Sequence, residues 1–301
     1  MLSGTGARQP ETVMSEIVEL APAKINLALH VTGQRPDGYH LLESIVTFAD
    51  TGDRLTFSRS DEDRFTLSGR FSETLTEEAG SNLVIRARDR LRDLFHKAGV
   101  ATTPVSIHLE KNLPIASGIG GGSADAAATL RGLQRLWQAS PDADDLAHLA
   151  LTLGADVPMC LEGVPALARG VGEELHPLSR FPSLPMVIGN PLRGVSTPEV
   201  FSKLGTKHNP PLGSLDDSDW MDTLSRLRND LEGPARGLVP EIGEISGLIA
   251  AEGALLTRMS GSGATCFGIF ASGSAAAHAA ARLRALKPCW YFEATQTIAG
   301  S

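Results

Sequence analysis

The sequence predicts an α+β protein built from two domains. At 301 residues the chain is longer than a single hydrophobic core usually organises. Segments in which apolar and polar residues alternate, the period of a half-buried strand, are interspersed with segments of helical period. The last third of the chain, two extra helices aside, has the predicted order βαββαβ, which is typical of a ferredoxin-like domain. We therefore expect a first domain over residues 15–172 and a second over residues 185–301, joined by a linker that is rich in proline.

The first domain is predicted to combine short strands with three helices. Asn82 is a plausible N-cap for a helix that ends at Gly99, and a third helix is expected to open at Ser140-Pro141 and to end at Gly154. Between them, the spacing of Ala126, Leu130, Leu133 and Trp137 predicts one buried helix face. Strands are expected at residues 17–20, 24–31, 45–48, 54–57, 64–67 and 105–109.

The second domain is predicted to begin with a strand at residues 186–189. Helices are expected at residues 198–204 and 220–228, and a further helix is expected to end at Gly253. Strands at residues 255–259 and 265–270 flank a turn, and a helix capped by Ser274 and stopped by Pro288 precedes a last strand at residues 290–297. Residues 1–13 show no periodicity, so that Met14 is an alternative start of the chain.

Composition excludes several classes of function. The net charge of −8, with no basic face or tail, argues against binding to nucleic acid or to a membrane surface. Cys160, Cys266 and Cys289 are odd in number and far apart, as is typical of free thiols in a reducing compartment. No apolar run has the length of a membrane span, and residues 1–14 lack the apolar core of a signal peptide, so we expect a cytoplasmic protein. The sequence does not predict the oligomeric state.

The most informative stretch joins the strand at residues 105–109 to the helix that follows. Glycine occupies positions 118, 120, 121 and 122, directly before Ser123 and the predicted helix. Glycines allow close approach of the backbone to a ligand, and the free N–H groups and dipole of a helix N-terminus attract anions. The stretch therefore predicts a phosphate-binding loop, although it is neither a Walker A loop nor a G-x-G-x-x-G dinucleotide motif. A tight loop closing onto a helix, without a ligand, is the alternative.

Other candidate residues are ambiguous when they are taken alone. Asp156 follows a helix-closing glycine, and it is expected to be either a helix cap or a group that accepts a proton. Lys24 opens a predicted strand and, without further evidence, would be a solvated strand end. The turn at residues 260–263 is either a second anion-binding nest or an ordinary glycine-rich hairpin.

The glycine-rich stretch resembles the phosphate loop of the GHMP kinases, a superfamily of ATP-dependent small-molecule kinases. Ala21-Pro22-Ala23-Lys24-Ile25-Asn26-Leu27 with Gly38-Tyr39-His40, then residues 153–158 and 261–264, are similar to further signatures of one branch, in the same order. The resemblance implies an N-terminal domain of the ribosomal-protein-S5 type, a ferredoxin-like C-terminal domain, and an active site between them. It also implies a substrate that carries cytidine diphosphate and is phosphorylated on a hydroxyl.

The same resemblance implies a role for each matching residue. Lys24 and Asp156 would be the catalytic pair, and Asn26, Tyr39, His40, Thr197 and Phe201 would bind the substrate, with the cytosine between Tyr39 and Phe201. Asn82 and Lys111 correspond to positions near the adenine. The loop that would bind ATP comprises Pro114, Ile115, Ala116, Ser117, Gly118, Ile119, Gly120, Gly121, Gly122, Ser123 and Ala124.

The chain departs from the family pattern at one position. Many loops of the family have a second serine where this chain has Ala124, so Ser123 is left as the possible protein ligand of the Mg²⁺ that accompanies ATP. Two alternatives to this function remain open on the sequence: a homoserine- or mevalonate-type kinase of the same superfamily, and a non-catalytic nucleotide-binding protein. Such a binding protein is expected to lack the pair of Lys24 and Asp156, and here both residues are present.

Overall fold

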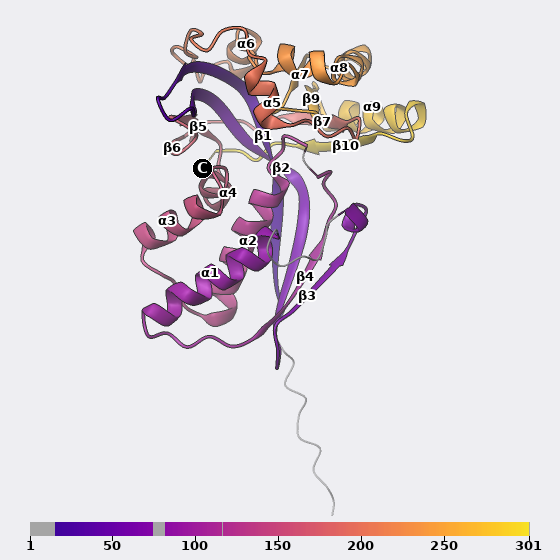
Figure 1. The fold of residues 1–301 in the computed structure, drawn as a ribbon. Helices are drawn as coiled ribbons and strands as arrows, with labels where there is room; N and C mark the ends of the chain where they lie inside the picture. The colour runs from indigo at the N-terminus through magenta and orange to yellow at the C-terminus, as the bar shows by residue number, and fades with distance from the viewer. Residues whose placement is uncertain (1–15, 75–81, 116, 301) are drawn as a thin grey trace, which may run out of the picture.

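The computed structural model describes residues 16–74, 82–115 and 117–300, and they form two layered units that share one apolar core (Figure 1). Three positions named above lie outside the described residues: residue 15, the predicted start of the first domain; Met14, the alternative start of the chain; and Ala116 of the glycine-rich loop. The α+β class and the two-domain fold predicted from the sequence are confirmed. Within the described part of the chain, no helix is long and apolar enough to cross a membrane.

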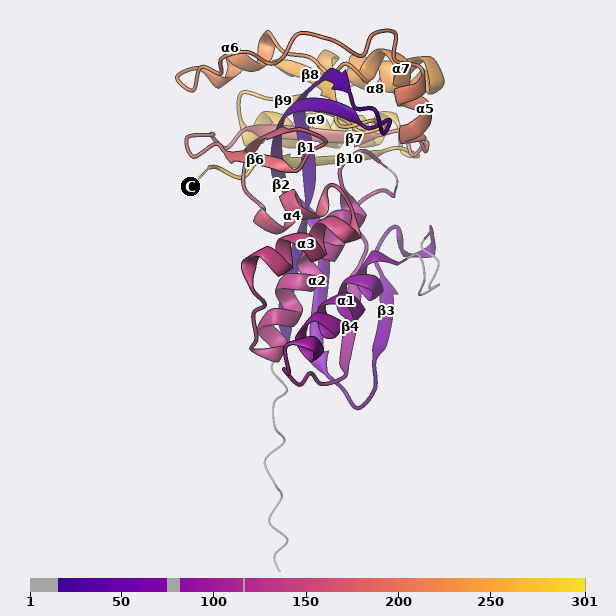
Figure 2. The same cartoon turned by 60° about the vertical axis from the view of Figure 1, so that its left-hand side comes forward.

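The first unit is a six-stranded sheet with helices on one face (Figures 1 and 2). The strands follow the order β3-β4-β2-β5-β6, and β1 pairs with β2. They are β1 (Ile17–Gln34), β2 (His40–Arg59), β3 (Arg64–Ser68), β4 (Val105–Glu110), β5 (Ala166–Arg169) and β6 (Glu174–Pro177). The helices are η1 (Ser72–Thr74), α1 (Leu83–Lys97), α2 (Gly121–Trp137), α3 (Ala143–Leu153) and α4 (Val157–Glu162).

The hairpin of β1 and β2 is longer than expected. Two strands were predicted for each half, at residues 17–20 and 24–31 and at residues 45–48 and 54–57, but the structure has one 18-residue and one 20-residue strand. The register of the pair shifts between Pro22 and Lys24, which is where the predicted strands were separated. From Ala23 to Val31 every residue of β1 is buried, because this part of the strand packs against the second unit as well as pairing with β2 (Figure 2).

The second unit is an antiparallel sheet in the order β10-β7-β9-β8, with α8 and α9 packed on one face. Numbered within the unit, this is the order fourth, first, third, second that a βαββαβ chain adopts in a ferredoxin-like sheet. The strands are β7 (Pro185–Asn190), β8 (Leu256–Met259), β9 (Cys266–Ile269) and β10 (Tyr291–Gln296). The helices are α5 (Thr197–Ser202), α6 (Trp220–Ser225), α7 (Glu232–Leu238), α8 (Glu241–Ala251) and α9 (Gly273–Leu286).

Several predicted boundaries are wrong for local reasons. The N-cap of α3 is Asp142 rather than Ser140, because the side chain of Asp142 accepts the N–H of Asp144. The N-cap of α9 is Ser272 rather than Ser274, because the side chain of Ser272 accepts the N–H of Ala275. The helices α4 and α7 and the strands β5 and β6 were not predicted, since each has seven residues or fewer and shows little periodicity. Strand β6 pairs with β5, so the first sheet continues past residue 172 into the predicted linker.

One apolar core joins the two units. Met186 and Ile188 of β7 share a cluster with Ile25 and Leu27 of β1, whereas Val187, on the other face of β7, packs beneath the helices of the second unit. The second sheet is therefore held directly against the hairpin that carries Lys24 and Asn26. This packing fixes the walls of the cavity that lies between the units.

Candidate active site

The glycine-rich loop lies where α2 begins, and its backbone requires glycine at two positions. Helix α2 starts at Gly121, so the amides of the glycine run are those of the first turn of a 17-residue helix. Gly118 and Gly120 have φ values of +75° and +66°. A Cβ at Gly118 would lie 2.6 Å from the carbonyl oxygen of Ser260, and one at Gly120 would lie 3.1 Å from Cβ of Lys24. Side chains are therefore excluded at Gly118 and at Gly120, as is typical of a loop that binds an anion through its backbone.

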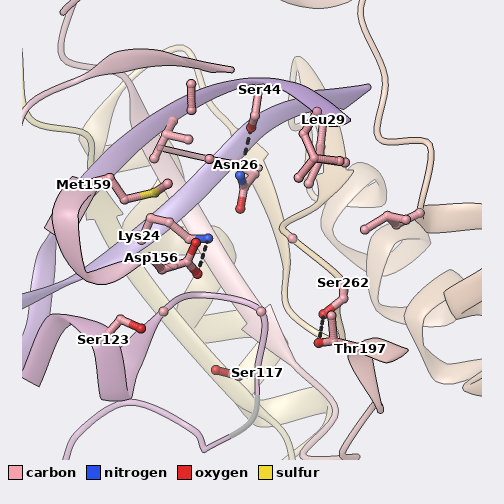
Figure 3. A pocket seen from close by; sticks show the side chains of 18 of the residues that line it. Lys24, Asn26, Leu29, Ser44, Ser117, Ser123, Asp156, Met159, Thr197 and Ser262 are labelled. Atoms are coloured by element: carbon pink, nitrogen blue, oxygen red, sulfur yellow. Dashed lines mark hydrogen bonds and ion pairs between the residues drawn. The ribbon is translucent and has the colours of Figure 1, made fainter. Parts of the chain in front are cut away.

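Lys24 and Asp156 lie beside this loop and form an ion pair (Figure 3). Lys24 Nζ donates to Asp156 Oδ2 at 2.9 Å, and the backbone N–H of Lys24 donates to the carbonyl of Ile119 at 2.9 Å. The side chain of Lys24 is 6% exposed and that of Asp156 is 39% exposed, so the carboxylate is open to a ligand while the ammonium is enclosed. Asp156 occupies the N-cap position of α4, but its side chain makes no capping hydrogen bond. The geometry therefore favours the prediction that Asp156 accepts a proton over the prediction that it caps a helix.

The turn at residues 260–263 packs directly on the glycine-rich loop. It connects β8 to β9 as a hairpin would, and a Cβ at Gly261 would lie 2.7 Å from the carbonyl oxygen of Gly118. The hydroxyl of Ser260 accepts the N–H of Asn26 at 3.0 Å and donates to the carbonyl of Gly118 at 3.1 Å. One buried hydroxyl thereby joins the first strand, the glycine-rich loop and the second unit.

A cavity of about 380 Å³ lies between these three elements. Lys24, Asp156, Ser117, Ser123 and the glycines at 118 and 120–122 line it on one side, and Asn26 lines it on another. The amide of Asn26 donates to the hydroxyl of Ser44 at 2.8 Å, and Asn26 Oδ1 has no partner among the described residues (Figure 3). A buried acceptor without a partner at a cavity wall is suited to a hydroxyl donor on a ligand.

An adjoining cavity of about 850 Å³ contains the aromatic candidates. Tyr39, His40, Thr197 and Phe201 line it, and Asp156 and Ser123 line both cavities, which are therefore continuous. The ring of Phe201 is stacked on His40 with centroids 4.5 Å apart, whereas Tyr39 is 64% exposed. The structure thus brings Tyr39 and Phe201 to the same cavity, with His40 covering one face of Phe201.

Asn82 and Lys111 border a smaller cavity of about 150 Å³ on the other side of the loop. Gly121 and Gly122 line this cavity as well as the larger one. The side chain of Asn82 accepts the N–H of Val84 and caps α1, as expected. Pro114 and Ile115 also line this cavity, whereas Ala124 is buried in the core of the first unit.

Lys111 is buried in an ionic cluster that sequence reasoning did not find. Its Nζ donates to Asp53 Oδ2 at 2.5 Å and to Asp125 Oδ2 at 2.6 Å, and Asp53 Oδ1 also accepts the N–H groups of Asn112 and Leu113. Although burial lowers the pKa of Lys111, the carboxylates of Asp125 and Asp53 raise it above its ordinary value, so the ammonium stays charged. The cluster lies under Gly121 and ties the start of the loop to β2 and α2.

Asp125 makes the stability of the protein depend on pH. Burial raises the pKa of Asp125 to about 7 in the folded protein, from an ordinary value of 3.8. Between these values the folded state binds a proton that the unfolded state has lost, so this group makes the free energy of unfolding fall as the pH rises. We expect Asp125→Asn to gain stability relative to the wild type as the pH is raised from about 4 to 7, because the variant cannot titrate. Urea unfolding of both proteins across this range measures the difference, and a difference that does not change with pH would contradict the assignment.

Two of the lining residues, Ser44 and Lys207, carried no sequence signal. Ser44 positions Asn26 from the middle of a long strand, and Lys207 reaches the outer cavity from an irregular segment after α5. Ser262 belongs to the glycine turn, and its hydroxyl lies 2.7 Å from that of Thr197, which links the turn to α5 (Figure 3). A pattern of local periodicity cannot report such contacts, because they join segments far apart in the chain.

Comparisons with known proteins agree with this arrangement. Two family models match the chain, that of the GHMP kinases N terminal domain at residues 82–164 and that of the GHMP kinases C terminal domain at residues 213–289. A homoserine kinase from Cytophaga hutchinsonii has the same fold, with a TM-score of 0.70 and 19% identity, over 97% of this chain and 98% of that chain. The fold and the glycine-rich loop are those of a GHMP kinase.

More similar proteins define a narrower group. A crystal structure of 4-(cytidine 5'-diphospho)-2C-methyl-D-erythritol kinase matches with a TM-score of 0.80 and 36% identity, over 94% of this chain and 100% of that chain. A 4-diphosphocytidyl-2-C-methyl-D-erythritol kinase from Rhizobium etli is 62% identical over 284 residues, which are 94% of this chain and 96% of the relative. One from Agrobacterium fabrum is 58% identical over 290 residues. The chain belongs to the GHMP kinases and, within them, to the family of 4-diphosphocytidyl-2-C-methyl-D-erythritol kinases.

Proposed function

We propose that this protein transfers the γ-phosphoryl group of ATP to the 2-hydroxyl of 4-diphosphocytidyl-2-C-methyl-D-erythritol, in the non-mevalonate route to isoprenoid precursors. The observation that carries the proposal is the pair of Lys24 and Asp156, 2.9 Å apart, between a glycine-rich loop and a cavity with aromatic walls. Among the substrates of the GHMP kinases, this one is supported by the 62% identity of the chain to a 4-diphosphocytidyl-2-C-methyl-D-erythritol kinase. We expect a cytoplasmic enzyme.

Asp156 is proposed to accept the proton of the substrate hydroxyl. The hydroxyl oxygen then attacks the γ-phosphorus, the bond between this phosphorus and the bridging oxygen breaks, and ADP leaves with that oxygen. Lys24, whose ammonium lies 2.9 Å from the carboxylate of Asp156, offsets negative charge on the reacting oxygens. The enclosed Lys24 and the accessible Asp156 suit these two roles.

The nucleotide is proposed to lie across the glycine-rich loop. Asn82 and Lys111 border the small cavity and would lie near the adenine, and the amides of residues 118–123 would hold the phosphates in the larger one. Because Lys111 is held by two carboxylates, we assign it to positioning the loop rather than to a direct phosphate contact.

Magnesium is proposed to accompany ATP, and it supplies charge neutralisation on the phosphates when it is bound. The described residues hold no group of three or more His, Cys, Asp or Glu side chains that is suited to a metal ion. Of the two loop serines that line the cavity, Ser117 donates its hydroxyl to the carbonyl of Pro114 at 2.7 Å, which leaves the hydroxyl of Ser123; the carboxylate of Asp156 lines the same cavity. This donor set fits an ion held mainly by the nucleotide, with Ser123 as the protein ligand.

Turnover with a panel of alcohols tests the proposal. The purified protein is incubated with ATP and, separately, with the cytidine substrate, homoserine and mevalonate, and ADP release is measured. ADP release that depends on the cytidine substrate alone supports the proposal. Dependence on homoserine or mevalonate would replace it with a different GHMP kinase activity, and binding of ATP without turnover on any acceptor would indicate the non-catalytic alternative.

The cytosine is proposed to stack on Tyr39 and Phe201. Base–aromatic stacking contributes about 1–3 kcal/mol per ring, so Tyr39→Ala and Phe201→Ala are each expected to raise KM for the cytidine substrate by about 5- to 150-fold. The base is remote from the reacting hydroxyl, so kcat and the KM for ATP are expected to change far less. Because Tyr39 is 64% exposed, Tyr39→Ala is expected to melt at the wild-type temperature. A wild-type KM in Tyr39→Ala, or a lowered melting temperature with an unchanged KM in Phe201→Ala, would contradict stacking by that ring.

A further inference from the structure

The outer cavity contains a cation for which the proposed chemistry has no role. Lys207 lines this cavity together with Tyr39, His40 and Phe201. It lies in the segment between α5 and α6, far from the catalytic pair in the sequence. Its side chain is partly exposed, so a ligand in the cavity can reach it.

The fold holds Lys207 at this position through contacts with the β1 strand. Nζ of Lys207 donates to the side-chain oxygen of Gln34, at the end of β1, at 2.9 Å. Two residues later, the backbone N–H and the side-chain amide of Asn209 both donate to the carbonyl of Val31, each at 3.0 Å. The lysine is therefore presented by a segment that is anchored beside the cavity.

The charges around the two cavities leave Lys207 unneutralised. Of the described residues that line them, only Lys24 and Lys207 carry a permanent positive charge. Lys24 is paired with Asp156, whereas among the described residues no carboxylate lies within 4.0 Å of Lys207. Asp37, which also lines the outer cavity, is paired with Arg35. Burial and, after it, the charge of Lys207 lower the pKa of His40, so this neighbour is neutral at pH 7.

The substrate of the proposed function has a matching negative charge. Its diphosphate links the cytidine, which we place against Tyr39 and Phe201, to the erythritol, whose hydroxyl must reach Asp156. Tyr39, Phe201 and Asp156 all line the outer cavity, so we place the diphosphate within it. We propose that the ammonium group of Lys207 binds the phosphate oxygens of the cytidine diphosphate group. This inference rests on the proposed function and adds the residue that recognises the charge of the substrate.

Titrations with cytidine, CMP and CDP in the absence of ATP test the assignment. By calorimetry, the wild type is expected to bind CDP more tightly than cytidine. Lys207→Gln is expected to weaken CDP binding by about 5- to 20-fold and to leave cytidine binding within about twofold, because the variant loses only the charged contact. Lys207→Arg is expected to recover most of the affinity for CDP. As a matched control, Lys203→Gln, four residues earlier and at neither cavity, is expected to bind all three ligands as the wild type does.

Three results would overturn the assignment. They are an unchanged affinity of Lys207→Gln for CDP, an equal loss for cytidine and CDP, which would indicate a base contact, and a loss in Lys207→Arg as large as in Lys207→Gln. The pKa of His40, followed by proton NMR, is expected to rise in Lys207→Gln since the nearby positive charge is gone, and the melting temperature of the variant controls for folding, because lost burial would also raise this pKa.

Steady-state kinetics separate this inference from the proposed function. If the wild type phosphorylates the cytidine substrate, Lys207→Gln is expected to raise KM for that substrate by the same factor as for CDP binding, with a much smaller change in the KM for ATP. A wild type that turns over and a variant with an unchanged KM would overturn the role of Lys207 alone. A wild type that does not turn over with this substrate would overturn the proposed function, and the titrations would still decide whether Lys207 binds phosphate.

Discussion

Asp156→Asn is expected to lower kcat by about 10²- to 10⁴-fold, the usual effect of removing a general base. Asparagine has nearly the same shape as aspartate but cannot accept the proton of the attacking hydroxyl. In the structure, Lys24 Nζ donates to Asp156 Oδ2 at 2.9 Å. The amide oxygen of an asparagine can accept the same hydrogen bond, so the local geometry should persist. Binding constants for ATP and for the cytidine substrate, measured separately by calorimetry, are expected to change little.

The folding of this variant is expected to be normal. The side chain of Asp156 makes no capping bond to α4 and is 39% exposed, so its replacement removes little native structure. Asp142→Asn is the matched control, because Asp142 caps the neighbouring helix α3 and lies at neither cavity. It is expected to keep full activity. A near-normal kcat in Asp156→Asn would show that the proton leaves by another route.

Lys24→Met is expected to reduce kcat by a comparable factor. Methionine keeps an apolar stem against Gly120, next to which the side chain of Lys24 lies, while it removes the ammonium group. Without this charge, the carboxylate of Asp156 and the developing charge on the reacting oxygens should lose their counterion. Steady-state kinetics measure the loss, which is expected in kcat rather than in the KM for ATP or for the cytidine substrate.

The double variant measures how the two residues cooperate. Groups that act as a unit give losses that are far from additive, so Lys24→Met with Asp156→Asn is expected to be scarcely slower than either single variant. Melting temperatures of all three proteins control for folding. Losses in kcat that multiply would show that Lys24 and Asp156 act independently, and the proposed mechanism would then fail.

Local structure in this protein is largely predictable from the sequence. The N-cap at Asn82, the helix behind the glycine-rich loop and the βαββαβ order depend on interactions between residues a few positions apart, which propensity and periodicity report directly. The position of the glycine-rich loop directly before α2 also follows from the glycine spacing and the helical period after it. The resemblance to the GHMP kinases then supplied the candidate roles for residues such as Tyr39 and His40, which the residue types alone left ambiguous.

Prediction fails where a strand continues through a short break in its local pattern. Ala21-Pro22-Ala23 interrupts the alternation of β1, so a single strand was predicted as two, although β1 stays paired with β2 on both sides of the break. The short strands β5 and β6 are stabilised by pairing with β2 and with each other, and four residues carry too little pattern to reveal them.

The sequence by itself determined a glycine-rich loop directly before a helix, and the resemblance to the GHMP kinases added Lys24 and Asp156 as the candidate catalytic pair. Only the tertiary structure decided that Lys24 and Asp156, 132 residues apart, form an ion pair, that Phe201 stacks on His40, and that Lys207 lines the outer cavity. The physical reason is that these contacts depend on how the second sheet packs against the β1–β2 hairpin. That packing comes from apolar burial, which has no direction and leaves no local mark at the polar residues that it brings together.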